Sequence, residues 1–154
     1  MHGRLFEIRE QRLDRDEWIT ESAFYEEETG NWCDWVMVSE DREGDLEWLK
    51  SALPASIFKV EGDEIEIISD GKEFVEEWIE ELKKKVNSLT YEKAMSFSGL
   101  YQIKWSLSNM LNNDFMFYSD YSEYAHNPTE FIQDCLCNYQ GKKLYVCGII
   151  DYHF

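Results

Sequence analysis

The sequence predicts a single α+β domain spanning 1–154, in which a mixed sheet of about five or six strands is packed by four or five helices. Three observations predict this fold class. Strand-like and helix-like segments alternate along the 154 residues, no Pro/Gly/Ser-rich linker divides them, and 44% hydrophobic residues supply a core. The last segment, 143–154, is apolar on both faces from Leu144 to Ile150, which predicts a central strand covered on each side.

The first part of the chain predicts two strands that flank a short helix. Asp14 and Glu17 have the spacing of a capping box, a pair that often begins a helix. The elements expected here are a strand over 3–10, a helix over about 15–23, a charged loop over 26–31 and a strand over 32–38.

Two further helices are expected in the middle of the chain. Ser39 or Asp41 can cap a helix over about 42–53, whose leucines recur at helical spacing. Asp70 and Glu73 form a second capping-box pattern, and the apolar residues that follow lie on one face of a long helix.

A hairpin and an ambiguous segment complete the middle of the chain. Short apolar runs over 57–60 and 64–68 flank Glu61-Gly62-Asp63, which predicts a three-residue turn with glycine available for positive φ. The apolar residues of 97–113 fit a helix and a strand equally well, and the length of the segment favours a helix. A short strand over 115–118 follows.

The segment around the second proline predicts the last helix. Asn127-Pro128-Thr129-Glu130 supplies a cap, a first-turn proline and an acid together, and Gly141 ends the helix. Cys135 and Cys137 are two residues apart, so a helix directs them about 200° apart and they cannot chelate one metal together. We expect reduced, structural cysteines, no metal site, no cofactor and a cytoplasmic location.

The acidity of the chain is concentrated in its first half. The net charge is -17, and residues 1–70 hold 20 acids and 7 bases. Residues 71–105 hold six of each. Direct binding to nucleic-acid phosphates or to an anionic membrane needs clustered Lys and Arg, so this balance disfavours both.

Two interpretations of the acidic half remain open. It is either a solvated face that keeps the protein soluble or a surface with exposed aromatic anchors that engages a basic protein partner. Under the second interpretation, the candidate partner-binding residues are Asp41, Glu43, Asp45, Glu47, Trp32 and Trp35.

Catalytic motifs are scarce. The chain has no phosphate-binding loop, dinucleotide fingerprint, nucleophile elbow or HExxH motif. Asp151 and His153 share one face of the expected last strand, so the carboxylate could orient a histidine base; they are the only catalytic candidates.

These observations favour a non-enzymatic binding protein that engages or inhibits a basic partner, in the manner of an immunity protein or of a DNA mimic. A small hydrolase or transferase using Asp151 and His153 is the alternative from another class. An accessory subunit without chemistry is a third, and the sequence leaves the oligomeric state open.

Overall fold

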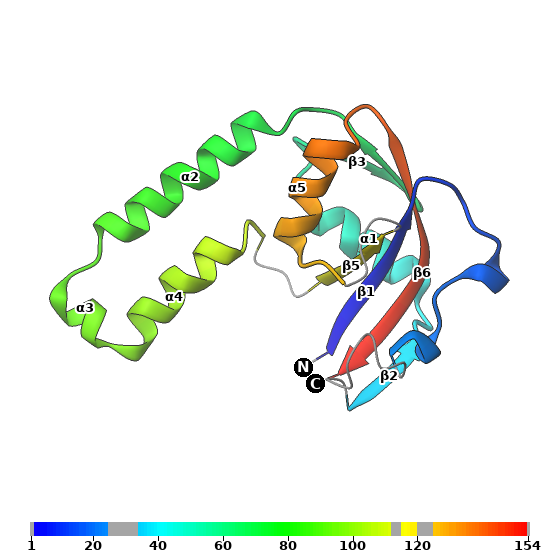
Figure 1. Cartoon of the computed structure of the whole chain (residues 1–154), viewed down its shortest axis with the longest axis horizontal. Coiled ribbons are helices and arrows are strands. Elements are labelled where there is room, and N and C mark those ends of the chain that lie inside the picture. Colours follow the sequence, from blue (N-terminus) through cyan, green and yellow to red (C-terminus); the bar gives the residue numbers. More distant parts are fainter. Residues whose placement is uncertain (1, 25–33, 112–114, 120–124, 154) are drawn as a thin grey trace.

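A six-stranded mixed sheet with β6 at its centre forms the body of the protein (Figure 1). The computed structural model describes residues 2–24, 34–111, 115–119 and 125–153. The strands are β1 (His2–Arg9), β2 (Trp35–Val38), β3 (Phe58–Glu61), β4 (Glu64–Ile67), β5 (Phe115–Ser119) and β6 (Lys143–His153). Their order is β3-β4-β6-β1-β5, and β2 also pairs with β6. Only β1 and β5 run parallel among the paired strands described, so the sheet is mixed, as the sequence predicts.

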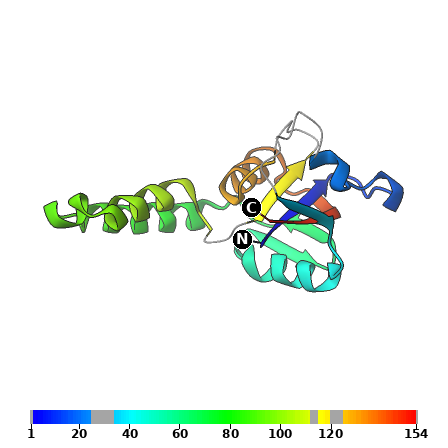
Figure 2. The same cartoon turned by 90° about the horizontal axis from the view of Figure 1, so that it is seen from below.

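The helices fall into two groups, which Figure 2 separates clearly. They are α1 (Arg42–Ala52), α2 (Lys72–Asn87), α3 (Tyr91–Met95), α4 (Phe97–Ser108) and α5 (Pro128–Asn138), with 3₁₀ turns η1 (Arg15–Glu17) and η2 (Glu21–Phe24). Helices α1 and α5 contribute buried residues to the larger core cluster. Helices α2, α3 and α4 form an arm that projects away from the sheet (Figures 1 and 2).

Strand β6 is central and buried on both faces, which confirms the prediction from its apolar run. One edge of β6 pairs with β1, while β4 and β2 share its other edge end to end. Phe6 pairs with Ile149 and Ile8 with Val146, so β6 carries an extra residue opposite Glu7. This bulge interrupts the alternation of buried and more exposed side chains along β6, and residues 146–150 of the strand are all buried.

The core has a larger and a smaller part. The larger cluster includes Leu49 of α1, Ile65 of β4 and Ile132 of α5. The smaller cluster includes Ile150 and Tyr152 of β6, against which Ile19 packs from the segment after η1. Each cluster draws on β1 and β6, so these two strands hold the body together.

The helix expected over 15–23 is wrong. The capping box of Asp14 and Glu17 is present, but it starts only the 3₁₀ turn η1. The next backbone amide, that of Ile19, donates to the carboxylate of Glu7 at 2.9 Å, and Trp18 is extended. Because the buried Glu7 of β1 accepts this hydrogen bond, the amide of Ile19 does not donate to a helical carbonyl.

The long second helix begins later than its capping pattern suggests. The cap of α2 is Gly71 in the left-handed region at φ 67°, and Asp70 accepts a hydrogen bond from the amide of Lys72 at 3.1 Å. Leu136 of α5 occupies the space that a side chain at Gly71 would fill. The close contact with α5 therefore fixes where the arm starts.

Most other elements lie where the sequence places them. Segment 97–108 is the helix α4, and residues 112–114 lie outside the described residues. The loop expected over 26–31 and the first two residues of the strand expected over 32–38 also lie outside them. The hairpin turn has two residues rather than three because Glu61 pairs with Glu64, and Gly62 has φ 59°. In α5, Cys135 is buried and Cys137 exposed, as their spacing predicts.

Candidate functional site

The arm formed by α2, α3 and α4 carries no buried residue. From Lys72 to Met110 every side chain is exposed or only partly buried. The arm is attached at its two ends: Phe74 packs against the larger core, and the amide of Met110 donates to Oγ1 of Thr129 at 2.7 Å. Apart from the contact of Phe74, the arm therefore adds surface to the molecule without adding to its core.

Hydroxyl caps shape the far end of the arm. Thr90 caps α3 by accepting from the amide of Lys93, and Ser96 caps α4 by accepting from the amide of Gly99. The ammonium of Lys93 also donates to the carbonyl of Ser88 at 3.0 Å, which ties α3 back to the end of α2. These local bonds satisfy helix-end groups, so the chain reverses direction without a hydrophobic core.

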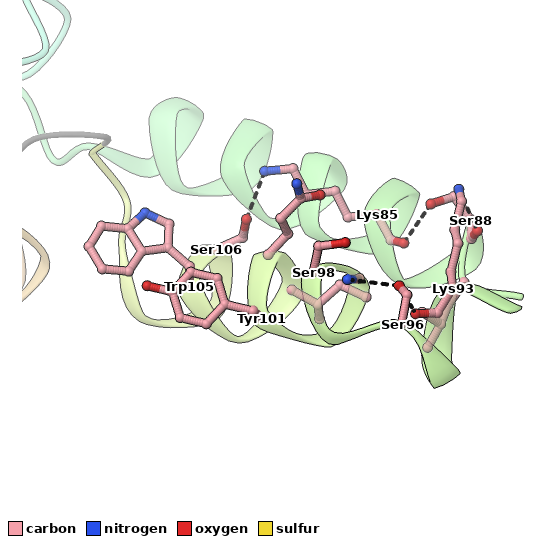
Figure 3. A pocket seen from close by; sticks show the side chains of 12 residues that line it. Lys85, Ser88, Lys93, Ser96, Ser98, Tyr101, Trp105 and Ser106 are labelled. Carbon is pink, nitrogen blue, oxygen red and sulfur yellow. Dashed lines mark hydrogen bonds between the residues drawn. The ribbon is translucent and has the colours of Figure 1, made fainter. Parts of the chain in front are cut away.

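A groove of about 670 Å³ lies between α2 and α4 (Figure 3). Lys85 spans it by donating to Oγ of Ser106 at 2.8 Å. The lining combines small hydroxyl and glycine residues with larger aromatic ones: Lys85, Ser88, Leu89, Lys93, Ser96, Ser98, Gly99, Tyr101, Gln102, Ile103, Trp105 and Ser106. Its lining residues include no acid, in contrast to the overall acidity of the chain.

An aromatic stripe runs along α4. Phe97, Tyr101 and Trp105 are four residues apart, so they lie on one side of the helix. Their exposed fractions are 91%, 56% and 40%. The rings of Phe97 and Tyr101 stack at 6.3 Å between centroids, and Figure 3 shows Tyr101 and Trp105 together on the same side of α4.

Further large apolar side chains surround the aromatic stripe. Tyr91 and Met95 of α3 and Leu100 and Leu107 of α4 are each more than half exposed. Exposed apolar side chains that gather on one element are typical of a protein-binding surface. We therefore take the arm as the candidate functional site.

The acidic candidates on α1 separate into exposed and internal residues. Glu43 and Glu47 are exposed, and Asp41 is the exposed cap of the helix, accepting from the amide of Gly44 at 3.0 Å. Asp45 is buried, pairs with Arg4 at 2.9 Å and accepts a hydrogen bond from Ser39. Asp45 is therefore an internal structural residue and not part of the exposed acidic surface, which corrects its place among the partner-binding candidates.

Trp35 is the tryptophan candidate that lies within the described residues. Trp35 opens β2, lies opposite His153 in the ladder and is 40% exposed. Trp32 lies outside the described residues.

Asp151 and His153 each pair with a residue from another element. The carboxylate of Asp151 lies 2.6 Å from Nη1 of Arg4, and Nδ1 of His153 lies 2.9 Å from Oδ1 of Asp34. This hydrogen bond holds the pKa of Asp34 below its ordinary value, although some burial opposes the shift. The orienting carboxylate of His153 is thus the exposed Asp34 that precedes β2.

Within the described ranges, no group of three His, Cys, Asp or Glu residues is arranged to hold a metal ion. A membrane-spanning helix is likewise not found there. Comparisons with protein-family models, with curated proteins and with solved structures find no match to the chain.

The sequence reasoning missed the arm as a site. The sequence predicts an apolar face on the helix after Asp70 and a helix or a strand over 97–113, and neither expectation says whether these side chains are covered. One signal was present: α4 holds a single charged side chain, Lys104, in its 12 residues. A helix that is apolar on nearly every side is either buried or made to be covered by a partner.

Proposed function

We propose that this chain is a non-enzymatic binding protein that docks a basic protein partner through its helical arm. The exposed aromatic stripe of Phe97, Tyr101 and Trp105 carries the proposal. Tryptophan and tyrosine are enriched among the residues that dominate binding energy, and anchors at helical spacing fit a helix-in-groove contact. Inhibition of a basic enzyme or toxin is the concrete form that this function would take.

The arm is large enough for a specific contact. Seven large apolar side chains of α3 and α4 are 40–91% exposed. With aromatic side chains presenting roughly 150–250 Å² each, they expose on the order of 800 Å². A standard interface buries about 800 Å² on each partner.

Charge distinguishes a basic partner from a second copy of this chain. The arm holds six acids and six bases between residues 72 and 108, so the whole net charge of -17 belongs to the rest of the chain. Two copies joined through their arms would bring two strongly negative bodies into one particle. A basic partner would instead be attracted by the body while the neutral apolar arm makes the close contact.

The body and the arm have separate roles under this proposal. Exposed acids such as Glu43 and Glu47 accelerate encounter over a screening length of about 8–10 Å. The apolar arm slows dissociation because it excludes water from the contact. Added salt should therefore change the association rate much more than the dissociation rate.

The test identifies the partner at the arm itself. A variant with a photo-crosslinking amino acid in place of Tyr101 is expressed in the native host. The protein that becomes crosslinked to this variant is identified and then purified. Stopped-flow kinetics at two salt concentrations then compare the wild type with the double variant Phe97→Ser/Tyr101→Ser. Ile68→Ser is the matched control because Ile68 is also exposed but belongs to the body.

We expect a crosslinked protein of high isoelectric point whose association slows as salt rises. The double variant should weaken its binding at least tenfold, and Ile68→Ser should leave binding unchanged. A crosslink to a second copy of this chain, an acidic crosslinked protein, or equal binding by the double variant would overturn the proposal.

A further inference from the structure

The sheet has a gap on the edge of β6 that β4 and β2 share. Strand β4 pairs with β6 only as far as Tyr145, and β2 pairs with it only from Ile150 onward. Arg42, the first residue of α1, fills part of this gap. Its guanidinium donates to the carbonyl of Cys147 at 2.5 Å and to that of Val146 at 2.6 Å.

A pocket of about 280 Å³ lies beside this gap. Its lining residues are Arg12, Leu13, Arg15, Trp18, Arg42, Asp63, Val146 and Cys147. Three of the five arginines of the chain therefore converge on one small pocket of a protein whose net charge is -17. Acids are twice as common as bases in this chain, so such a concentration of positive charge is a specific feature of the fold.

The indole of Trp18 orders two of the guanidiniums. The guanidinium carbon of Arg42 lies 4.5 Å from the ring centroid of Trp18, and that of Arg15 lies 5.7 Å from it. The indole nitrogen donates to the carbonyl of Leu13 at 3.1 Å, which fixes the ring. Stacking on an aromatic face leaves the N–H edges of Arg15 available to an acceptor. Arg42 already donates to the two carbonyls of β6, so it contributes mainly its positive charge and its remaining N–H groups.

The positive charge of the pocket is only partly balanced. Arg12 pairs with Asp63 at 3.0 Å, and the ion pairs of the described residues give neither Arg15 nor Arg42 a carboxylate. Cys147 adds no negative charge near neutral pH, because burial raises the pKa of its thiol. Burial lowers the pKa of Arg42, so the charge of this guanidinium is also poorly solvated.

We propose that this pocket binds a phosphate group. Three arginines and one aspartate leave two positive charges, which match the charge of about -1.5 to -2 that a phosphate monoester carries at pH 7. The planar donor edges of guanidinium groups suit the oxygens of phosphate better than a point charge does. The volume admits a phosphate with a few further atoms, so the ligand is inorganic phosphate or a small phosphorylated molecule.

The test measures binding of inorganic phosphate by calorimetry and by the shift of the melting temperature, at constant ionic strength set with chloride. Phosphoserine and acetate are titrated in parallel. The variants are Arg12→Gln and Arg15→Gln, which remove exposed charges that line the pocket. Lys59→Gln is the matched control, because Lys59 is an exposed cation of β3 that pairs with Glu61 outside the pocket.

We expect phosphate to bind and to raise the melting temperature of the wild type, and of the Lys59→Gln variant to the same extent. Each arginine variant should bind at least tenfold more weakly while remaining folded. Phosphoserine binding more tightly than inorganic phosphate would support a phosphorylated small molecule, and equal binding would support free phosphate. No binding, equal binding of acetate, or the same loss in Lys59→Gln would overturn the proposal.

Discussion

The guanidinium of Arg4 lies 2.9 Å from the carboxylate of Asp45 and joins strand β1 to helix α1. The same side chain contacts Asp151 of β6 at 2.6 Å, so one arginine links three elements. Asp45 is buried, whereas its helix neighbours Glu43 and Glu47 are exposed. On α1, Asp45 therefore stabilises the fold, whereas Glu43 and Glu47, two residues to either side, lie at the surface.

Replacing Asp45 by Asn should destabilise the protein. The substitution removes a charged partner from the partly buried Arg4, and the free energy of unfolding should fall by about 1.5–3 kcal/mol. Glu43→Gln and Glu47→Gln should each change it by less than about 0.5 kcal/mol. Urea unfolding of the three variants measures this, and three equal values would contradict the assignment of Asp45 as internal.

Removing the arm should leave the body folded. Residues 78–106 are replaced by six Gly and Ser residues, while Phe74 and Met110 are kept because they attach the arm to the body. No side chain from Lys72 to Met110 is buried, so the core loses nothing by this change. Amide NMR signals of β6 should stay close to their wild-type positions, and their collapse would show that the arm is needed for folding.

Strand β6 should be indispensable by contrast. Ile150 is fully buried, and Ile150→Ala should cost about 2–5 kcal/mol of unfolding free energy. Leu107→Ala in the arm is the control and should cost less than about 1 kcal/mol, because Leu107 is more than half exposed. A chain truncated after Lys143 should not fold, and a native-like near-ultraviolet circular dichroism spectrum of that chain would refute this expectation.

The cysteines should differ in reactivity. In a Cys33→Ser background, an aromatic disulfide reagent should modify Cys137 rapidly in the native protein. Cys135 and Cys147 should react only after unfolding, since burial raises the pKa of both thiols and denies access to the reagent. Absorbance of the released reagent counts the modified thiols, and rapid native modification of Cys135 would contradict its place in the core.

The pair of Asp34 and His153 should contribute to stability only above acid pH. The hydrogen bond from His153 lowers the pKa of Asp34 in the folded state, so the contribution is present above the unfolded-state pKa of about 3.9. It is lost as pH falls through the folded-state value. NMR titration of the Asp34 carboxyl carbon should give a lowered pKa in the wild type and an ordinary one in His153→Gln, and identical curves would exclude the pair.

Local patterns predicted the parts of the fold that local interactions determine. The capping box of Asn127 and Glu130 begins α5 as expected, because each bond joins residues three apart. The helix expected over 15–23 fails because Glu7, 12 residues before Ile19, takes the amide of that residue. Such a contact depends on how β1 meets the following loop, which helix-capping patterns do not encode.

In the candidate sites, too, local patterns predict the helices but not the contacts between distant segments. The apolar face of α2 is visible in the sequence, but the sequence does not say which elements cover that face. In the structure Phe74 packs against the larger core, and α4 lies beside the rest of the helix. The arginine pocket joins residues as far apart as Arg12 and Cys147. The pairing of β6 with β1 and β4, and the contact of Arg42 with β6, bring these residues together, so no local spacing predicts the pocket.

The arm also separates the sequence requirements of folding from those of recognition. A position in the core is constrained by packing whatever the protein does, so its tolerance to mutation says little about function. Exposed positions of α4 carry much less of this constraint, because no residue of the helix is buried. A saturation library of α4 selected for activity in the host should therefore record the shape of the bound partner, residue by residue, with little interference from the needs of the fold.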